Sequence, residues 1–242
     1  MEQKFVIIGG SGGIGSALAR KLAGQGHGVH LIGRNAEKLA QIAEEISGSY
    51  AVADVEQPEQ MQAAMMGAGE AISGLIYAVG TITLKHFTKL TAAEISHDFG
   101  VNVLGAITAV QSALPLLKSN VGISSILLFS TVAVGQGFPA HASIAAAKGA
   151  IEGLTRSLAA EFAPHIRVNC IAPSLIKTPL TAGITSNEQM AEAIAGMHAL
   201  QRLGEPNDIA ALGAFLLSPD ASWISGQIIG VDGGRSSLRA KG

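Results

Sequence analysis

Residues 5–15 read Phe5-Val6-Ile7-Ile8-Gly9-Gly10-Ser11-Gly12-Gly13-Ile14-Gly15. The first four form a short, unbroken apolar run, which is typical of a buried parallel strand. After the glycines, Ile14, Leu18 and Leu22 recur at helical spacing. A glycine-rich turn by itself can be simply a tight turn. Between a strand and a helix, however, it lets the backbone approach a pyrophosphate and offers the free N–H groups of a helix N-terminus, so we expect a nucleotide here.

The alternation of strand and helix continues along the whole chain. Apolar runs predict further strands at residues 28–32, 50–53, 74–80, 126–129, 166–173 and 226–231. Periodic apolar residues predict helices at about 36–46, 57–66, 91–117, 143–162 and 208–217, the third with a break near Gly100 and a kink at Pro115. The pattern predicts an α/β fold in which residues 1–242 form a single dinucleotide-binding domain. Its core would be one doubly wound, Rossmann-type parallel sheet with helices on both faces.

The composition agrees with this fold class. Hydrophobic residues make up 48% and charged residues 14% of the 242 residues, which suits strands that need no polar side. The formal net charge is -2 and Lys and Arg do not cluster, so we expect no nucleic-acid partner and no membrane. An uncharged run at 119–147 is long enough to cross a bilayer, but Asn, Gln, Gly and Pro interrupt it. Cys170 is the single cysteine, which excludes a disulfide framework and fits a cytoplasmic protein.

The second predicted strand ends at Gly33-Arg34-Asn35, where dinucleotide-binding folds meet the adenosine ribose. An acidic residue there would accept a hydrogen bond from the ribose 2′-hydroxyl, but neither Gly33 nor Arg34 is acidic. The planar guanidinium of Arg34 instead suits a 2′-phosphate. Although Arg34 can also be a solvated loop residue, its position favours NADP(H) over NAD(H).

Lys148 is a lone cation in an apolar segment. It lies in Ala142-Ser143-Ile144-Ala145-Ala146-Ala147-Lys148-Gly149-Ala150-Ile151, and no Asp, Glu, Arg or Lys lies between it and Lys118. Such a cation either reaches out to water from a crowded helix face or serves a site. We expect Lys148 to serve a site.

These motifs together resemble those of the short-chain dehydrogenase/reductase family over almost the entire chain. Gly9-x3-Gly13-x-Gly15 resembles its cofactor loop, Asp54-Val55 its adenine-contacting pair and Asn102 its active-site asparagine. The segments 166–178, 202–206 and 225–234 resemble its sixth strand, nicotinamide-side loop and carboxyl-terminal signature. The resemblance implies no metal site and a cofactor site formed by Gly9, Ser11, Gly13, Ile14, Gly15, Arg34, Asp54, Val55, Ala78, Gly80, Lys148, Pro173, Ile176 and Thr178.

The departures from the family pattern fall where the chemistry should be. In the family, a tyrosine four residues before the lysine donates or accepts the proton, and a serine thirteen positions upstream of that tyrosine orients the carbonyl. Ile144 and Thr131 occupy these positions here. Isoleucine cannot transfer a proton, whereas Thr131 can still donate to a carbonyl oxygen and Lys148 can still bind ribose hydroxyls. The Asn-Asn-Ala-Gly usual after the fourth strand reads Tyr77-Ala78-Val79-Gly80, and Ser174 replaces the glycine that usually follows Pro173.

Several groups are candidates to replace the missing phenol. His141 shares a helix face with Ile144 if the helix has begun there, and histidine is a suitable acid–base residue, but a position beside Pro139 favours an exposed loop residue. Tyr77 offers a hydroxyl unless strand alternation turns it into the helix layer, and Ser143 suits a helix N-cap better than a catalyst. Lys148, or a water that it holds, can deliver the proton if desolvation lowers its pKa. The candidate catalytic residues are Lys148, Thr131, Asn102 and His141.

Two functions remain open at this point. In the first, the protein is an NADP(H)-dependent oxidoreductase of a small carbonyl or alcohol, with an altered proton relay because Ile144 replaces the tyrosine. In the second, it is a catalytically impaired NADP(H)-binding sensor or assembly subunit. A segment at about 180–200 predicts a substrate lid, in which apolar residues face either the substrate or one another: Ile184, Met190, Ile194 and Met197. The weakly polar helices at 101–117 and 143–162 predict a homodimer or homotetramer.

Overall fold

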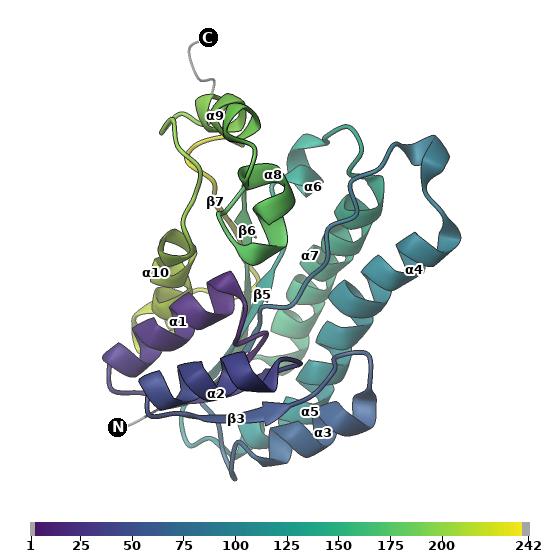
Figure 1. The fold of residues 1–242 in the computed structure, drawn as a ribbon. Coiled ribbons are helices and arrows are strands. Elements are labelled where there is room, and N and C mark those ends of the chain that lie inside the picture. Colours follow the sequence, from purple (N-terminus) through teal and green to yellow (C-terminus); the bar gives the residue numbers. More distant parts are fainter. Residues whose placement is uncertain (1–2, 239–242) are drawn as a thin grey trace.

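The strands form one parallel sheet. The computed structural model describes residues 3–238, and its seven strands pair in the order β3-β2-β1-β4-β5-β6-β7 (Figure 1). Their bounds are β1 Lys4–Ile8, β2 Gly28–Gly33, β3 Ser49–Val52, β4 Gly74–Tyr77, β5 Ser124–Phe129, β6 Ile166–Pro173 and β7 Ile228–Val231. After β3 the chain returns to the other side of β1, where it forms β4. Doubly wound sheets bind ligands at the carboxyl ends of the strands beside such a reversal. The predicted fold class is confirmed.

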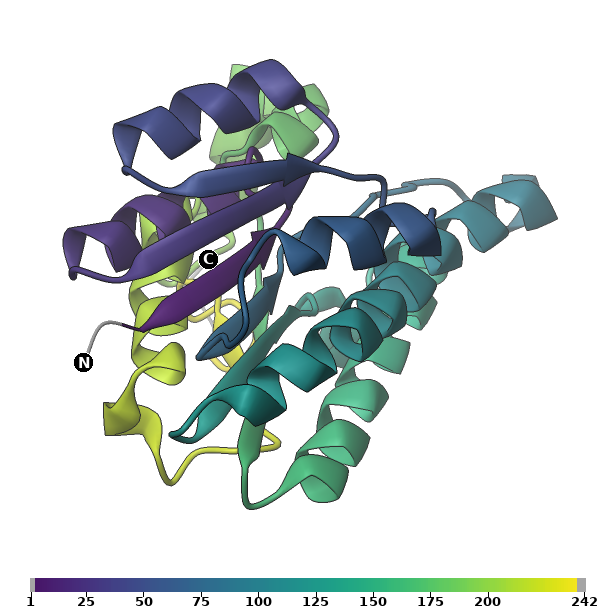
Figure 2. The same ribbon diagram turned by 90° about the horizontal axis from the view of Figure 1, so that it is seen from below.

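Helices cover both faces of this sheet (Figure 2). The bounds on one face are α1 Gly13–Gly24, α2 Ala36–Glu45 and α10 Pro206–Leu217, and on the other α3 Pro58–Met66, α5 Gly105–Ser119 and α7 Ala142–Phe162. Alternation along β1 divides its buried side chains between two cores. Phe5 and Ile7 pack with the first set of helices, and Val6 and Ile8 with the second. Each such burial contributes roughly 1.5–3 kcal/mol, which explains the unbroken apolar run at 5–8.

A continuous helical run leads into α5. Thr91 caps α4 (Ala92–Phe99), since Thr91 Oγ1 accepts from Glu94 N–H at 3.3 Å and Glu94 Oε2 accepts from Thr91 N–H at 2.9 Å. The predicted break near Gly100 is a π-helical segment, η2 (Gly100–Leu104), and Pro115 lies inside α5. The run Ala92–Ser119 is long and apolar enough to cross a membrane by composition. Half of its most apolar window is buried inside the protein, as is common in core helices.

Some boundaries differ from the prediction. α7 begins one residue earlier than expected, so Ser143 lies inside the helix and His141 is the N-cap. β7 starts two residues late because Gly226 adopts a φ of 74°, which no extended strand has. The sequence analysis also missed short elements: η1 Phe87–Lys89, α6 Ala133–Gln136 and η4 Pro219–Ala221.

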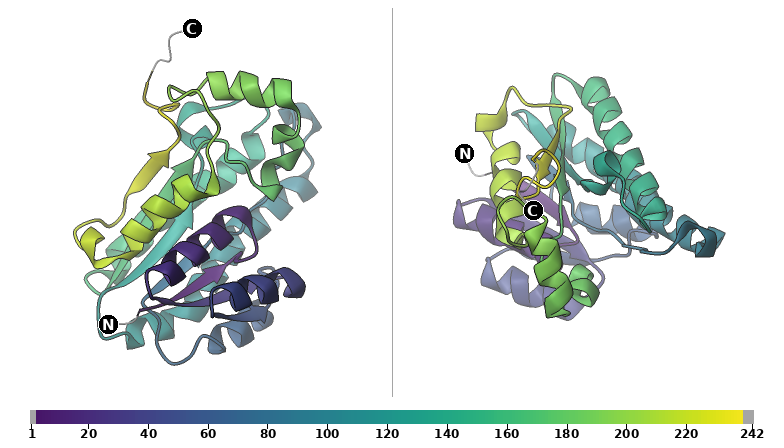
Figure 3. Two further views of the ribbon diagram at one scale, coloured as in Figure 1. Left: turned by 60° about the vertical axis from the view of Figure 1, so that its left-hand side comes forward. Right: turned by 90° about the horizontal axis from the view of Figure 1, so that it is seen from above.

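The segment expected to be a lid is helical and lies beyond the carboxyl ends of the strands (Figures 1 and 3). It consists of η3 Pro179–Thr181, α8 Ala182–Thr185 and α9 Glu188–Gly196. Asn187 caps α9, because its Oδ1 accepts a hydrogen bond from Met190 N–H at 3.0 Å. Short helices connected by short turns can move as small units, which suits a cover over a binding site.

Candidate active site

The turn after β1 is closed tightly by backbone. Gly9 has a φ of 84°, Gly12 N–H donates to Gly9 O at 2.9 Å, and α1 begins at Gly13 without a side-chain cap. A Cβ at Gly9 would lie 2.6 Å from Ala78 O, and a Cβ at Gly13 would lie 2.7 Å from Thr178 Cγ2. Neither position accommodates a side chain, and the open helix N-terminus fits a pyrophosphate. The structure thus brings these predicted cofactor residues together.

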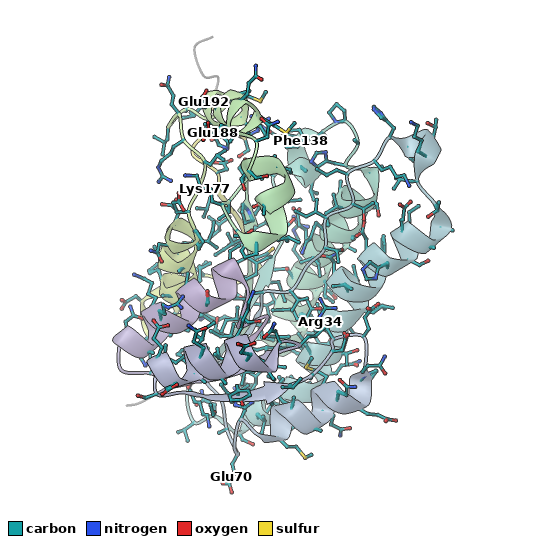
Figure 4. The ribbon with its side chains drawn as sticks, in the orientation of Figure 1. Arg34, Glu70, Phe138, Lys177, Glu188 and Glu192 are labelled. Carbon is teal, nitrogen blue, oxygen red and sulfur yellow. The ribbon has the colours of Figure 1, made fainter. Side chains whose placement is uncertain are left out.

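Arg34 lies at the carboxyl end of β2, where the adenosine end of a dinucleotide is expected. Its side chain is 76% exposed, and its Nη1 lies 3.9 Å from Asp54 Oδ2 (Figure 4). Asp54 is itself fixed, since its Oδ1 accepts from Glu56 N–H at 3.0 Å. The other guanidinium N–H groups of Arg34 are therefore available to a phosphate. Ser11 lies next to this strand end, as a Cβ at Gly33 would be 3.5 Å from Ser11 Oγ.

The remaining adenosine-side residues play supporting roles. Val55 is buried in the core beside Asp54. Gly15 lies against the turn itself, because a Cβ there would overlap the carbonyl oxygen of Gly9. Both residues thus lie close to the part of the chain where the resemblance implies the cofactor site.

A cavity of about 500 Å³ lies at the carboxyl ends of the strands, with the lid as one of its walls. Its lining contains ten of the predicted site and pocket residues: Ile14, Ala78, Gly80, Thr131, His141, Ile144, Lys148, Pro173, Ile176 and Thr178. It also contains the four apolar lid residues named above: Ile184, Met190, Ile194 and Met197. The walls are mainly apolar with a few polar groups, which is the usual character of a small-molecule site.

Lys148 is buried in the wall of this cavity. The residue is only 8% exposed, and it forms no ion pair with any residue in the range 3–238. Burial lowers the pKa of Lys148 to about 8, although the nearby Cys170 and Asp98 oppose the change. Ile144 lies one helical turn earlier and lines the same cavity, as the four-residue spacing predicts.

Asn102 presents a buried hydrogen-bond acceptor beside Lys148. Its Nδ2 donates to Thr81 Oγ1 and to Asp98 O, both at 2.8 Å, which fixes the orientation of the amide. Its Oδ1 has no hydrogen-bond partner within the described chain. A Cβ at Gly80 would lie 3.0 Å from Asn102 Oδ1 and 3.4 Å from Lys148 Nζ, so both groups flank this glycine. A free acceptor near a buried ammonium group fits a ribose hydroxyl or a bound water.

Asp98 is a buried carboxylate that the sequence analysis did not single out. It accepts hydrogen bonds from Thr81 Oγ1 at 2.6 Å, Thr83 Oγ1 at 3.1 Å and Ser143 Oγ at 2.5 Å. This cluster ties α4 to the start of α7 and to the chain after β4. The prediction that Ser143 is an N-cap is wrong, because its hydroxyl has this stronger, charged acceptor. The sequence offered one indication that Asp98 is buried: it lies three residues after Ile95, which places both residues on the same face of the helix.

Thr131 is the hydroxyl after β5 that remains open to the cavity. Its Oγ1 accepts from Ala133 N–H at 3.3 Å, and its O–H donates to no residue of the described chain. The neighbouring Ser130 instead donates to Glu152 Oε1 at 2.8 Å. Thr131 can therefore donate to a carbonyl oxygen, which is the role implied by its position.

The structure separates the candidates for the missing proton donor. The Tyr77 hydroxyl donates to Val101 O at 2.5 Å inside the core, and burial raises its pKa, so it takes no part in the site. His141, for which the sequence left a catalytic role and an exposed loop position open, lines the cavity, with Nδ1 2.7 Å from Pro139 O. His198, in contrast, is buried against Ser174, which also lines the cavity and which the sequence analysis noted only as a departure from the family pattern.

Comparison with known proteins agrees with this geometry. A family model described as enoyl-(acyl carrier protein) reductase matches residues 9–236. A tropinone reductase homolog of Arabidopsis thaliana is 36% identical over 241 residues, covering 95% of this chain and 90% of that protein. A tropinone reductase homolog of Datura stramonium is 36% identical over 244 residues, with the same two coverages of 95% and 90%.

Solved structures share the whole fold. A short-chain type dehydrogenase/reductase of Mycobacterium ulcerans has a TM-score of 0.91 at 27% identity, covering 99% of this chain and 92% of that one. For levodione reductase the TM-score is 0.91 at 28% identity, with 98% of each chain covered. A 3-ketoacyl-(acyl-carrier-protein) reductase of Brucella melitensis complexed with NADH gives 0.87 at 29% identity, covering 97% and 98%. The fold and site are those of NAD(P)-dependent oxidoreductases. Within that class, the chain belongs to the short-chain dehydrogenase/reductase family.

Proposed function

We propose that the protein is an NADP(H)-dependent carbonyl reductase or alcohol dehydrogenase for an apolar substrate, with an altered proton relay because Ile144 stands at the tyrosine position. The observation that carries the proposal is the buried Lys148, which has no ion-pair partner among residues 3–238, beside Asn102 Oδ1, which has no hydrogen-bond partner among the same residues. Burying an ammonium group without an ion-pair partner destabilises the folded protein. If no ligand bound this group, replacing the lysine by an apolar residue would make the protein more stable.

Each residue has a defined task in this proposal. The glycine turn and α1 bind the pyrophosphate, Arg34 binds the 2′-phosphate, and Lys148 binds the nicotinamide ribose. A bound nicotinamide cofactor supplies the hydride. Thr131 donates a hydrogen bond to the substrate oxygen, and the apolar lid excludes water from the reacting carbonyl.

The names of the relatives supply a rational substrate panel. Tropinone, levodione and 3-ketoacyl thioesters are all ketones, and an enoyl thioester tests the reaction named by the family model. Apolar ketones of several sizes complete the panel, because the cavity of about 500 Å³ admits a medium-sized molecule.

The proposal is tested by NADPH oxidation over this panel with two site variants and one control variant. Lys148→Ala should abolish turnover, whereas the exposed Lys118→Ala should leave it unchanged. Ile144→Tyr should increase kcat by at least tenfold, because general acid catalysis typically contributes 10²–10⁴-fold. Activity that survives Lys148→Ala would refute the assigned site, and no gain from Ile144→Tyr would show that the chemistry differs from that of the family.

A second function is favoured by Ile144 itself, which is 4% exposed and offers no proton. In this alternative the chain is an NADP(H)-binding sensor or assembly subunit. Tight NADPH binding by calorimetry, with no turnover of any ketone, would support it over the enzyme.

We further propose that the protein self-associates as a homodimer or homotetramer in the cytoplasm. The proposal is supported by exposed small residues on the outer face of α7, such as Ala146 and Gly153, and by Leu104, which is exposed in η2. Small residues allow two helices to approach closely, and an exposed leucine gains from burial.

A further inference from the structure

Ser174 and His198 form a hydrogen-bonded pair between β6 and the lid. Ser174 follows β6 directly, and His198 follows α9. His198 Nε2 lies 2.8 Å from Ser174 Oγ, and His198 Nδ1 lies 2.8 Å from Ile194 O. Because a carbonyl oxygen can only accept, Nδ1 carries a proton in both charge states of the ring. Nε2 is therefore the nitrogen that exchanges a proton with the Ser174 hydroxyl.

This pair lies between two cavities. Ser174 lines the substrate cavity together with Thr131, Ile144 and Lys148. Both members of the pair line a second cavity of about 200 Å³. Ser174 thus lines both cavities, whereas His198 lines only the second.

Charged groups surround the second cavity. It is lined by Asp232, which follows β7, and by Arg202 and Asp208, which pair with each other at 2.6 Å. Asp232 Oδ1 accepts from Gly234 N–H at 2.9 Å. The carboxylates and the guanidinium supply polar partners for water in this cavity.

We propose that Ser174 and His198 are the proton relay that replaces the tyrosine; this inference rests on the proposed function. A bound reduced nicotinamide would supply the hydride to the carbonyl carbon and would itself be oxidised, and the C=O π electrons would move to the oxygen. The alkoxide takes the proton of the Ser174 hydroxyl, and Ser174 takes the Nε2 proton of protonated His198. His198 is left neutral, with its proton on Nδ1, which donates a hydrogen bond to Ile194 O. Water in the second cavity, which Ser174 also lines, then returns a solvent proton through the Ser174 hydroxyl to Nε2.

Two departures from the family pattern meet in this site. The phenol is lost at Ile144, and a hydroxyl is gained at Ser174, where the family usually has glycine. Both residues line the same cavity. The hydroxyls of Tyr77 and Ser143 already donate to protein acceptors. The Ser174 hydroxyl, by contrast, is hydrogen-bonded to the imidazole of His198, which can return a proton to it.

The test is Ser174→Gly in the wild-type and in the Ile144→Tyr backgrounds. If Ser174 supplies the proton, kcat in the wild-type background should fall by at least tenfold, while the Kd for NADPH stays unchanged. In the Ile144→Tyr background the same substitution should lower kcat by less than about threefold, because the phenol then supplies the proton. Ser174→Thr keeps the hydroxyl and should retain turnover, and the exposed Ser222→Gly serves as the control.

A pH profile separates a proton relay from mere positioning. Reduction by the wild type should slow as the pH rises and His198 loses its proton. His198→Gln can still hydrogen-bond Ser174 but cannot titrate, so its slower rate should no longer depend on pH in this way. Equal losses from Ser174→Gly in both backgrounds, or an unchanged pH profile in His198→Gln, would overturn the relay. If Ser174→Gly leaves the turnover of the wild type unchanged, the relay is refuted and the proposed function stands. If the wild type shows no turnover, both are refuted.

Discussion

Replacing Lys148 by methionine should make the protein without cofactor more stable at neutral pH. Methionine has a similar length and no charge, so Lys148→Met removes the cost of burying an ammonium group. Burial lowers the pKa of Lys148 from 10.5 to about 8, and at about 1.4 kcal/mol per pKa unit this difference corresponds to about 3 kcal/mol. Because the unfolded chain holds this proton more tightly, the wild type loses this stability at every pH below about 8 and recovers it as the pH rises toward 10.5.

The assay is urea unfolding of both proteins without cofactor at a series of pH values from 7 to 10. We expect Lys148→Met to unfold with about 3 kcal/mol more free energy at pH 7 and the two curves to converge as the pH rises. The exposed Lys118→Met should differ from the wild type by less than about 0.5 kcal/mol. A Lys148→Met protein that is less stable than the wild type at pH 7 would show that the folded protein pairs this ammonium group, and the argument for its cofactor role would fail.

Three further outcomes follow from the structure. Arg34→Ala should raise the Kd for NADPH by about 10- to 100-fold and leave the Kd for NADH nearly unchanged, which calorimetry can measure. Equal effects on the two Kd values would show that Arg34 does not bind the 2′-phosphate. Asp98→Leu should lower the free energy of unfolding by about 3 kcal/mol or more, because it leaves three hydroxyls without their acceptor, and a smaller loss in urea would mean that water replaces the carboxylate. Gly153→Arg should give monomers by light scattering without loss of helix content, since a Cβ there meets nothing within 4 Å inside the protomer; an unchanged mass would place any interface elsewhere.

The parts of the fold that depend on local periodicity were predictable from the sequence. The unbroken apolar run at 5–8 can be satisfied only by burial on both faces, and the glycines after it fix the turn. The placement of Ile144 and Lys148 in one cavity follows from a spacing of one helical turn. Such features are determined by residues that lie close together in the sequence.

The parts that depend on distant contacts were not predictable in the same way. Ser143 and Asp98 are 45 positions apart, and Ser174 and His198 are 24 positions apart. No local pattern shows that these side chains meet, because the meeting depends on how α7 and the lid pack on the sheet. Ser143 is instructive, since its local preference for a helix N-cap gave way to a buried carboxylate.

The π-helical segment η2 couples the site to the outer surface of α5. It adds one residue to a turn and so offsets everything after it by about 100° around the helix axis. Asn102 lies within this offset, and α5 follows it without a break. Deleting one residue here would restore a regular α-helix. It would also rotate Asn102 about the helix axis relative to the exposed face of α5. Insertions and deletions at this point would therefore move Asn102 and the exposed face of α5 relative to each other.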